Sequence, residues 1–591
     1  MTQAVSEMAD RAFLGVERSA LGNRWQGPDA NLSRKTEAMA QITDLPPALC
    51  AVLARTGIAP QEARSYLEPA LRDLLPDPRS LRDMEKAAAR FLHACETGEK
   101  IAVFADYDVD GGASAALLVC WLRQMGRTAT LYVPDRIAEG YGPNAPAMSA
   151  LAATHDLIVC VDCGTLSHEA IAAASGADVV VLDHHLGAET LPPACAVVNP
   201  NRQDESGDLG HLCAAAVVFL MLVEANRQLR LKSVQGPDLM AMLDLVALAT
   251  VADVAPLIGV NRAFVRQGLR VMALRAREGL KALCDTASLG SAPNAYHLGF
   301  VLGPRVNAGG RIGAPDLGAR LLASEDPVEA EAIAQKLEML NLERREIEAR
   351  VRAEALAQVE ARGTCGPLVW AAGEGWHPGV IGITAARLKE AYNLPSVVIA
   401  LEGDEGKGSG RSMPGLDLGA AIQRLMREDL LLKGGGHKMA AGLTVARASL
   451  DAAMFRLSEL LAQQGGISAA SSSLKIDGIL MPGAVTLDLV EQLDAAGPYG
   501  ASAPAPRFAF PSMRIQSVRR IGETHLRARF SDGGKTALEA VAFGAFESDL
   551  GTMVAAAQGL CLHLAGRIEI NDWAGRRTVQ MRLEDAAIPD A

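Results

Sequence analysis

The sequence predicts an α/β protein of several domains: a doubly wound parallel-sheet domain, a long connecting helix, a second α/β domain and a C-terminal β-barrel. Its 591 residues exceed what one hydrophobic core usually supports. From about residue 98, short β-rich runs alternate with Ala-rich helical stretches, which is typical of parallel sheets. From about residue 470 the apolar runs become short and alternating, which favours a barrel. We expect domains at residues 1–90, 91–323, 324–363, 364–467 and 468–591.

The composition favours a protein of a reducing compartment. Ten cysteines without regular spacing do not suggest a disulfide scaffold, so a cytoplasmic location is expected. Cys160-Val-Asp-Cys163 is a lone CxxC inside an apolar run, which disfavours a zinc site. No apolar run reaches the roughly 18 residues of a membrane span, and no membrane partner is expected. The net charge of -12 argues against a broadly basic surface but allows a local nucleic-acid groove.

The first elements in the chain carry no recognisable chemistry. Residues 1–90 are polar and then contain Pro-punctuated amphipathic pieces, so we expect a leading helical segment. Short β-rich runs follow, and they predict the parallel sheet. These runs are Ile101–Phe104, Thr130–Val133, Leu157–Val161 and Val179–Leu182.

Three carboxylates follow the first predicted strand at alternate positions. If the chain stays extended, Asp106, Asp108 and Asp110 lie on one side and repel strongly, so a cation between them is expected. A solvated acidic loop is the alternative. A calcium-binding EF-hand loop is excluded, because position twelve, counted from Asp106, is Leu117 rather than a glutamate. The stretch therefore predicts a metal site where a strand turns into a helix.

Carboxylates and histidines also follow other predicted strands. Asp162 closes one apolar run, Asp183-His184-His185 closes the next, and Asp253 lies in a further apolar segment. Without Asp183, and with or without His185, these segments offer six or seven ligand groups. That number exceeds the needs of one ion, and carboxylates with one or two imidazoles suit Mn²⁺ or Mg²⁺ better than zinc. Two such ions are suited to displacement at phosphorus. The chemistry indicated is hydrolysis of a phosphoester or phosphoanhydride.

A long helix is predicted over residues 324–363. Ser324 is the expected N-cap and Gly363 the expected stop. Ile333, Leu337 and Leu340 belong to an apolar stripe among charged residues. The helix either joins two domains or packs on one of them, and the periodicity alone leaves both open.

Gly-rich turns with basic residues characterise the second α/β segment, residues 365–465. They are Lys407-Gly-Ser409-Gly-Arg411 and Gly434-Gly-Gly-His437. Glycine lets backbone N–H groups approach phosphate oxygens, and Arg411 and His437 could clamp a phosphate. By itself the second motif is equally compatible with a tight turn.

Arginines and aromatic residues gather in the predicted barrel. Six arginines stand against one acid between residues 507 and 529. With Tyr499, Phe508, Phe510 and Phe530 they could form a groove with stacking platforms for single-stranded nucleic acid. The alternative is a solvated arginine face over a phenylalanine core. Residues 504–511 are interrupted by prolines and are not expected to form a regular strand. The groove candidates are Arg514, Arg519, Arg520, Arg527 and Arg529.

These motifs resemble those of the DHH phosphoesterase superfamily, and later ones resemble its RecJ family of single-stranded-DNA-specific exonucleases. The resemblance runs in order from about residue 40 to near the end of the chain. The first set is Asp106-Tyr-Asp-Val-Asp-Gly, Val161-Asp-Cys-Gly and Asp183-His-His. The later set is Glu139-Gly-Tyr-Gly, Leu212-Cys-Ala-Ala-Ala, Thr250-Val-Ala-Asp253-Val, Gly303-Pro-Arg305-Val-Asn307-Ala-Gly-Gly-Arg311, Trp376-His-Pro-Gly-Val-Ile-Gly, Lys407-Gly-Ser-Gly-Arg-Ser and Gly434-Gly-Gly-His.

The resemblance implies a set of site residues and the names of the domains. The sheet domain would be of DHH type, the second α/β domain of DHHA1 type and the barrel an OB-fold. Asp183 would orient a histidine from behind the ligands. The implied catalytic and metal-binding residues are Asp106, Asp108, Asp110, Asp162, His184, His185 and Asp253, with His185 either a ligand or a phosphate contact. The implied phosphate or DNA contacts are Ser114, Arg305, Asn307, Arg311, Ser409, Arg411, Gly435, Gly436 and His437.

The implied function is a 5′-to-3′ exonuclease that uses two Mn²⁺ or Mg²⁺ ions, releases mononucleotides and serves DNA repair and recombination. The expected partner is single-stranded DNA with a 5′ end. Single-strand-binding protein and a helicase are considered as protein partners, and a monomer is expected. Two alternatives are kept: a phosphohydrolase of short oligonucleotides or cyclic dinucleotides, and a non-catalytic DNA-binding scaffold.

Overall fold

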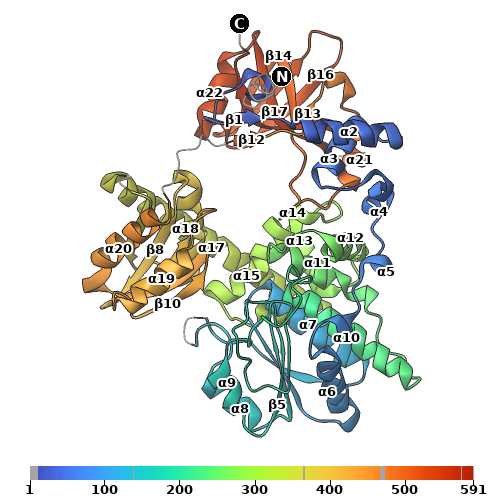
Figure 1. The fold of residues 1–591 in the computed structure, drawn as a ribbon, viewed down its shortest axis with the longest axis vertical. Helices are drawn as coiled ribbons and strands as arrows, with labels where there is room; N and C mark the ends of the chain where they lie inside the picture. Colours follow the sequence, from blue (N-terminus) through green and yellow to red (C-terminus); the bar gives the residue numbers. More distant parts are fainter. Residues whose placement is uncertain (1–10, 137–138, 364–365, 466–472, 574–575, 590–591) are drawn as a thin grey trace. The chain divides into compact units, whose positions relative to one another are not determined.

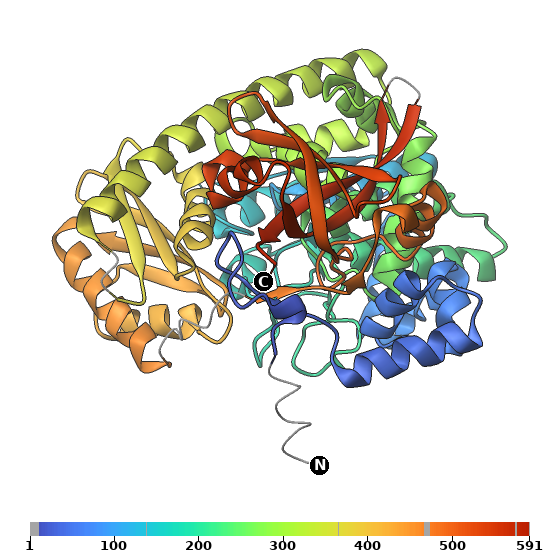
Figure 2. The ribbon, with the colours of Figure 1, turned by 90° about the horizontal axis from the view of Figure 1, so that it is seen from above.

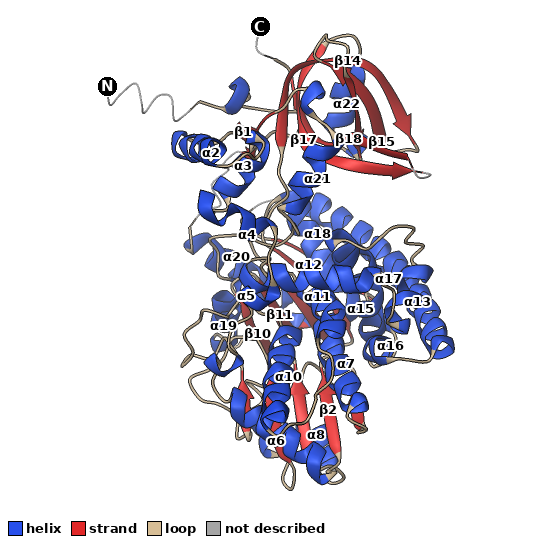
Figure 3. Ribbon diagram, turned by 90° about the vertical axis from the view of Figure 1, so that its right-hand side faces the viewer, coloured by secondary structure: helices blue, strands red, loops and turns tan. Residues whose placement is uncertain are grey.

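The structure is a computed structural model that describes residues 11–136, 139–363, 366–465, 473–573 and 576–589. Figures 1 and 2 show its ribbon from two sides, and Figure 3 distinguishes helices from strands. As far as the structure describes them, residues 76–255 and 264–469 form one compact unit, here the central unit. Residues 1–75, 256–263 and 470–591 form the other, here the terminal unit. The five sequence-based domain ranges stay a prediction.

A five-stranded parallel sheet forms the first half of the central unit. Its order is β3-β2-β4-β5-β6, and every neighbouring pair is parallel. Strands β2 and β4 are buried along their whole length, which explains why their sequences are continuously apolar. The predicted parallel sheet is confirmed; three-residue β6 was too short to predict. The strands are β2 (Ile101–Ala105), β3 (Ala129–Tyr132), β4 (Leu157–Val161), β5 (Asp178–Leu182) and β6 (Ala196–Val198).

Helices α7 and α10 pack against each other and against this sheet (Figure 3). Helix α7 is buried over most of its length and α10 over its first half, and these buried stretches are almost entirely apolar on every side, as buried helices require. Helix α11 packs on both and ends beside the carboxyl edge of the sheet. The helices of this half are α6 (Met84–Thr97), α7 (Val109–Gln124), α8 (Ala145–Ala152), α9 (His168–Ala172), α10 (Ala214–Leu231), α11 (Leu243–Ala252), α12 (Gly259–Ala273, which begins in the terminal unit), α13 (Glu278–Thr286), α14 (Ala295–His297), the π-helix η5 (Leu298–Leu302), α15 (Gly303–Ile312) and α16 (Leu317–Ala323).

The long helix α17 (Pro327–Arg362) joins the two halves of the central unit. Its first half packs against α13, α15 and α16, and its second half contributes Val351, Ala355 and Val359 to the core of the second sheet. Of the two alternatives, the helix that joins two domains is confirmed, and the helix packed on a single domain is not (Figure 2). The predicted N-cap Ser324 is wrong: Asp326 caps the helix through Val328 N, because Pro327 takes the first helical position. The C-terminal cap is Gly363, as predicted.

A second five-stranded sheet, of order β10-β11-β9-β8-β7, forms the other half of the central unit. Only β7 and β8 are parallel. The Gly-rich turns predicted here are wrong, since Lys407–Arg411 lies in β9 and Gly434–His437 in β10. A Cβ at Gly408 or Gly410 would lie 2.8 Å from Leu443 or Leu418, so these glycines make room for the core. The elements are β7 (Val369–Glu374), α18 (Pro378–Tyr392), β8 (Ser396–Glu402), β9 (Glu405–Arg411), α19 (Leu418–Arg427), β10 (Lys433–His437), β11 (Ala440–Ala446) and α20 (Leu450–Gln463).

A closed barrel forms the core of the terminal unit, which confirms the predicted C-terminal β-barrel. Strands follow the order β13-β14-β15-β16-β18-β17, and pairing of β14 with β17 closes the circle. The segment predicted to lack a strand enters β14 at Phe508, and Pro511 lies at a register shift between Phe510 and Met513. A bulge accommodates the proline, which cannot donate to the ladder. The elements are β12 (Ser473–Lys475), β13 (Gly478–Ile479), α21 (Leu487–Ala495), β14 (Phe508–Ile521), β15 (His525–Ser531), β16 (Ala537–Ala542), α22 (Asp549–Ala556), β17 (Cys561–Trp573) and β18 (Arg576–Ala587).

The N-terminal segment packs on this barrel. Strand β1 pairs with β12, and Leu49 and Leu53 of α3 are buried in the same core as the barrel residues. Arg55 donates to the Asp477 carboxylate at 2.7 Å. Within the described residues, no helix is long and apolar enough to cross a membrane. The N-terminal elements are β1 (Arg24–Gln26), α2 (Ala30–Ile42), α3 (Pro47–Arg55), α4 (Ala63–Leu67) and α5 (Leu71–Leu74).

Candidate metal centre and phosphate-binding site

The acidic stretch after β2 does not stay extended. The strand ends at Ala105 and α7 starts at Val109, so Asp106 follows the strand while Asp108 is the helix N-cap. Asp108 accepts hydrogen bonds from Asp110 N at 2.8 Å and Gly111 N at 3.1 Å. Asp110, in the first turn, accepts from Ala214 N at 2.6 Å and Ala215 N at 2.8 Å. The expected convergence on one side thus arises from a strand-to-helix turn and two helix N-termini.

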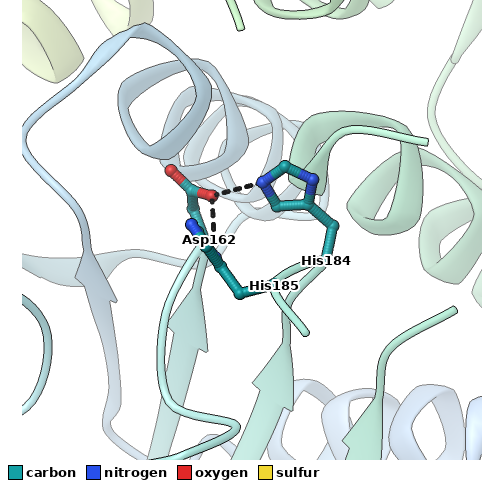
Figure 4. Close-up of side chains that lie close together, drawn as sticks. All are labelled: Asp162, His184 and His185. Carbon is teal, nitrogen blue, oxygen red and sulfur yellow. Dashed lines mark ion pairs between the residues drawn. The ribbon is translucent and has the colours of Figure 1, made fainter. Parts of the chain in front are cut away.

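Groups from three further segments converge on these carboxylates. His184 Nε2 lies 3.3 Å from Asp162 Oδ1 (Figure 4). The same nitrogen lies 3.7 Å from Asp110 Oδ2. His185 Nδ1 lies 3.9 Å from the same Asp162 oxygen. Asp253, the C-cap of α11, places Oδ2 3.9 Å from His184 Nδ1. Residues separated by up to 147 positions therefore meet at the carboxyl edge of the parallel sheet.

Asp183 lies behind the two histidines. It accepts from Thr165 N at 3.0 Å, from His184 N at 2.8 Å and from His185 Nδ1 at 2.8 Å. Burial acts to lower the pKa of His185, but Asp183 outweighs it and raises that pKa to about 9. The same hydrogen bonds hold the pKa of Asp183 below its usual range despite burial. Asp183 thus orients His185 through an imidazole–carboxylate contact.

The carboxylates repel one another in a buried site. Burial and then neighbouring carboxylates raise the pKa of Asp106, Asp110 and Asp162, and they raise the pKa of Asp253 to about 8. Oδ1 of Asp106 is buried and has no hydrogen-bond partner among the described residues. An unpaired acceptor among acidic neighbours is well placed to bind a cation.

Three overlapping groups have ligand atoms close enough to hold a cation. In each group the ligand atoms lie within 4.8 Å of one another. The donor set of carboxylate oxygens with imidazole nitrogens fits Mn²⁺ or Mg²⁺. The groups are Asp106, Asp108 and Asp162; Asp110, His184 and Asp253; and Asp162, His184 and His185.

The second sheet aligns the predicted phosphate contacts. His437, Ala440 and Arg411 are cross-strand partners on β10, β11 and β9, and Gly435, Gly442 and Ser409 are partners two residues away. Residues two apart in a strand share a face, so Ser409, Arg411, Gly435 and His437 lie on one face of the sheet. Arg411 Nη1 donates to Ser409 Oγ at 3.1 Å. Gly436 is held at φ 147° against β11, and a Cβ there would lie 2.4 Å from Ala440 O. Gly436 is therefore required for the close packing of β10 on β11.

The remaining predicted phosphate contacts are engaged by, or buried in, the fold around the site. Asn307 accepts from Val109 N at 3.1 Å and so fixes the acidic turn. Arg305 forms an ion pair with Glu338 and donates to Val301 O at 2.7 Å, so its guanidinium is occupied by helices of its own domain. Arg311 is half-buried and donates to Gly379 O at 3.1 Å, which links α15 to α18. Ser114 is fully buried in α7, and its Oγ has no hydrogen-bond partner among the described residues.

The aromatic platforms predicted in the barrel are not available. Phe508, Phe510 and Phe530 are fully buried in its core, and Tyr499 is packed against that core with its hydroxyl donating to Leu493 O. The solvated arginine face over a phenylalanine core, the alternative, is what the structure contains. Residues alternate along strands, so phenylalanines point inward where arginines point outward. The exposed arginines are Arg514, Arg519, Arg520, Arg527 and Arg529.

Three family models match the chain. The DHH family N-terminal domain matches residues 100–250, the DHHA1 domain residues 365–463 and the RecJ OB domain residues 476–585. The single-stranded-DNA-specific exonuclease RecJ of Dickeya dadantii is 37% identical over 575 residues, which cover 94% of this chain and 98% of that protein. The RecJ of Escherichia coli is 36% identical over 577 residues, covering 93% and 98%. The chain belongs to the RecJ family.

Solved RecJ structures share this fold. RecJ from Thermus thermophilus, in complex with Mn²⁺, matches with a TM-score of 0.79 at 29% identity, covering 96% of this chain and 80% of that one. An exonuclease RecJ bound to manganese matches with a TM-score of 0.57 at 34% identity, covering 66% and 96%. The family-model matches confirm the three domain types expected from the motifs: a DHH, a DHHA1 and an OB domain.

Three residues near the cluster were not singled out from the sequence. The Tyr141 hydroxyl donates to Asp162 O at 3.2 Å and lies 3.0 Å from His185 Nε2. Tyr107 lies edge-on to Tyr141 and beneath Arg136, whose guanidinium carbon is 5.1 Å from its ring centre. Arg136 also interacts electrostatically with Asp106, Arg311 and Arg411. Tyr107 and Tyr141 stand inside quoted RecJ motifs, whereas Arg136 is a lone arginine without a motif of its own.

Proposed function

We propose that the chain is a single-stranded-DNA-specific exonuclease that hydrolyses phosphodiesters from the 5′ end with two Mn²⁺ or Mg²⁺ ions and releases mononucleotides. The observation that carries the proposal is the set of three overlapping carboxylate–imidazole groups at one edge of the sheet. Membership of the RecJ family and the manganese in solved RecJ structures support it. A role in DNA repair and recombination would follow from this activity.

Seven residues would hold the ions: Asp106, Asp108, Asp110, Asp162, His184, His185 and Asp253. When bound, such ions activate water and neutralise charge that develops on the phosphate. Asp183 orients His185, and Asn307 holds the acidic turn through Val109 N. Tyr141 fixes the backbone at Asp162. These contacts preorganise the ligands before substrate arrives.

The phosphate-binding residues would come from the second sheet and from Arg136. Arg411, Ser409 and His437 share a face there, and Gly435 has open space around it, so a phosphate could approach its backbone. The positive charge of Arg136 lowers the pKa of both Asp106 and Arg411, so this guanidinium would add positive charge for a phosphate between the acidic cluster and Arg411. Gripping a terminal phosphate at a fixed distance from the cluster would make the enzyme cut one nucleotide from the end. Arg305, Arg311, Ser114 and Gly436 would support this arrangement.

The barrel would hold the rest of the single strand. Its outward arginines offer positive charge to the phosphate backbone, and the charge of Arg527 is partly neutralised by Glu539. Protein partners such as single-strand-binding protein or a helicase, a monomeric state and a cytoplasmic location remain predictions.

The test uses single-stranded oligonucleotides labelled at the 5′ or the 3′ end, with Mn²⁺ or with EDTA. Metal-dependent release of the 5′ label as a mononucleotide is expected, with at least about a hundredfold loss in Asp108→Ala. Asp451→Ala, an exposed acid on α20, is the matched control and should keep full activity.

Other outcomes decide between the alternatives. Release of the 3′ label first would reverse the proposed direction. Cleavage of dinucleotides or cyclic dinucleotides alone would identify a phosphohydrolase of short substrates. Binding of DNA without cleavage, across several metals and lengths, would identify a scaffold and overturn the nuclease.

A further inference from the structure

An exposed pair of aromatic side chains lies on the helical run that supports the acidic cluster. Tyr296 is 54% and Phe300 71% exposed. Their rings are stacked, with centres 5.0 Å apart and planes inclined by 25°. Single exposed hydrophobic residues are common, but two large rings stacked at i and i+4 form a continuous apolar face. Phe455 on α20 is comparably exposed, at 69%, and is not part of this stacked pair.

The backbone beneath the pair is held firmly. Residues 295–312 run without interruption through α14, η5 and α15, and the π-helix η5 occupies the turn that carries Phe300. Leu298 and Leu302 are fully buried, and a Cβ at Gly299 would lie 3.4 Å from Val251 Cγ1. Single π-turns inside α-helices often occur at functional sites. The buried side of this turn orients the two rings toward solvent.

The pair is close to the candidate metal ligands along two elements. Val251, which contacts the π-turn, lies two residues before Asp253 on the same chain segment. On the helical run itself, Asn307 holds Val109 N of the acidic turn. Phe300 precedes Asn307 by seven residues, which is about 10 Å along a helix axis. The rings therefore lie within a few nucleotide lengths of the cluster.

We propose that Tyr296 and Phe300 form a stacking site for an unpaired nucleobase of the DNA strand being cut. The inference rests on the proposed nuclease function and names one contact that it requires. Every base has a π-face, so such a site holds a strand without reading its sequence. A base paired in a duplex is covered on both faces, which makes the site selective for single strands. The phenylalanines of the barrel are buried and cannot stack on a base, so a stacking site has to come from elsewhere in the chain.

The experiment scans a 3′-fluorescein single-stranded oligonucleotide in which one nucleotide at a time, counted from the 5′ end, is abasic. Binding is measured by anisotropy in EDTA at constant salt, for wild type, Y296A/F300A and Phe455→Ala. We expect the double variant to bind the intact strand ~5- to 150-fold more weakly, which is the range for loss of one base stack. Phe455→Ala should bind as wild type does. One abasic position should weaken wild type by a similar factor and leave Y296A/F300A unchanged.

The proposal is overturned if the double variant binds as tightly as wild type, or if no abasic position distinguishes the two. Phe300→Leu, which keeps apolar bulk without a π-face, must lose affinity as well, and this guards against a folding defect. If wild type cleaves DNA and the double variant binds it normally, the stacking proposal is rejected and the nuclease proposal stands. Absence of cleavage by wild type would instead remove the proposed function.

Discussion

At the scale of single residues, one side chain can serve both the fold and the site. Asp108 caps α7 through two backbone N–H groups while its carboxylate belongs to a metal-binding group. The sequence pattern Asp-x-Asp-x-Asp revealed the acidic ligands but did not show the capping role. The capping role depends on where α7 begins, and this helix begins one residue after Asp108.

Asp108 variants should separate these two roles. Asp108→Ala removes ligand and cap, so activity should fall at least about a hundredfold, and the metal-free protein should lose about 1 kcal/mol of stability. Asp108→Asn keeps a capping oxygen and should lose activity without that loss of stability. Exonuclease assays and urea unfolding in EDTA measure the two effects. Equal destabilisation by both variants would contradict the capping role.

The cluster should also make stability depend on pH when no metal is bound. The folded-state pKa of Asp253 is raised to about 8, above its value in the unfolded chain. The folded state therefore binds extra protons, and this stability is present in full below about pH 4 and lost as pH rises toward 8. We expect the Tm in EDTA to fall between pH 6 and pH 8, and Mn²⁺ to raise the Tm more at pH 8, where its ligands are deprotonated.

Thermal unfolding of wild type and Asp253→Asn at both pH values, with and without Mn²⁺, checks this dependence. The variant should show a flatter pH profile in EDTA. A Tm in EDTA that rises from pH 6 to pH 8 would show that the carboxylates do not control stability.

At the scale of elements, glycines in the second sheet play two different parts. Gly410 on β9 faces Leu418, and a Cβ there would lie 2.8 Å from it, whereas Gly435 on β10 has nothing within 4 Å. Both belong to motifs that the sequence grouped together as phosphate-binding turns. The strand assignment separates them, because alternate residues of β9 face opposite sides of the sheet.

Alanine variants should distinguish packing from phosphate binding. Gly410→Ala should destabilise the protein by about 1–3 kcal/mol through overpacking. Gly435→Ala should leave stability within about 0.5 kcal/mol, but it should raise the KM for single-stranded DNA if the strand backbone approaches there. Urea unfolding and steady-state kinetics measure the pair. An unchanged KM in Gly435→Ala would remove this glycine from the phosphate site.

At the scale of the whole molecule, the terminal unit is built from both ends of the chain. Leu49 and Leu53 share a core with barrel residues, and Trp25 Nε1 donates to Asp585 at 3.2 Å. Residues 256–263 add Arg262, which donates to Ala496 O and Gly497 O at 2.8 Å. The leading segment is therefore a structural part of the barrel unit.

A truncated protein should stay soluble only if a whole structural unit is removed, including the parts that come from both ends of the chain. Deleting 470–591 alone exposes the apolar residues of α3 and should cause aggregation. Deleting 1–75 as well should restore solubility and leave a central fragment that binds Mn²⁺ and hydrolyses short substrates, with much weaker binding of long strands. Light scattering, thermal shift with Mn²⁺ and cleavage assays compare the two fragments. A soluble, active Δ470–591 protein would contradict the shared core.

Much of this organisation could be predicted from the sequence, because it depends on local patterns. Continuous apolar runs mark the buried strands, and the carboxylates and histidines after them mark the edge where parallel strands end. The long helix and the barrel follow from the spacing of apolar residues. The DHH and RecJ motifs supply the identities of the candidate ligands.

Tertiary structure decided the rest, because those features depend on contacts between distant segments. Only the fold shows that Phe510 is core and that Arg305 is engaged by Glu338. It also shows that β9 and β10 are strands whose face carries Arg411 and His437. Residue type determines what a side chain can do, whereas burial and neighbours determine whether it is free to do it.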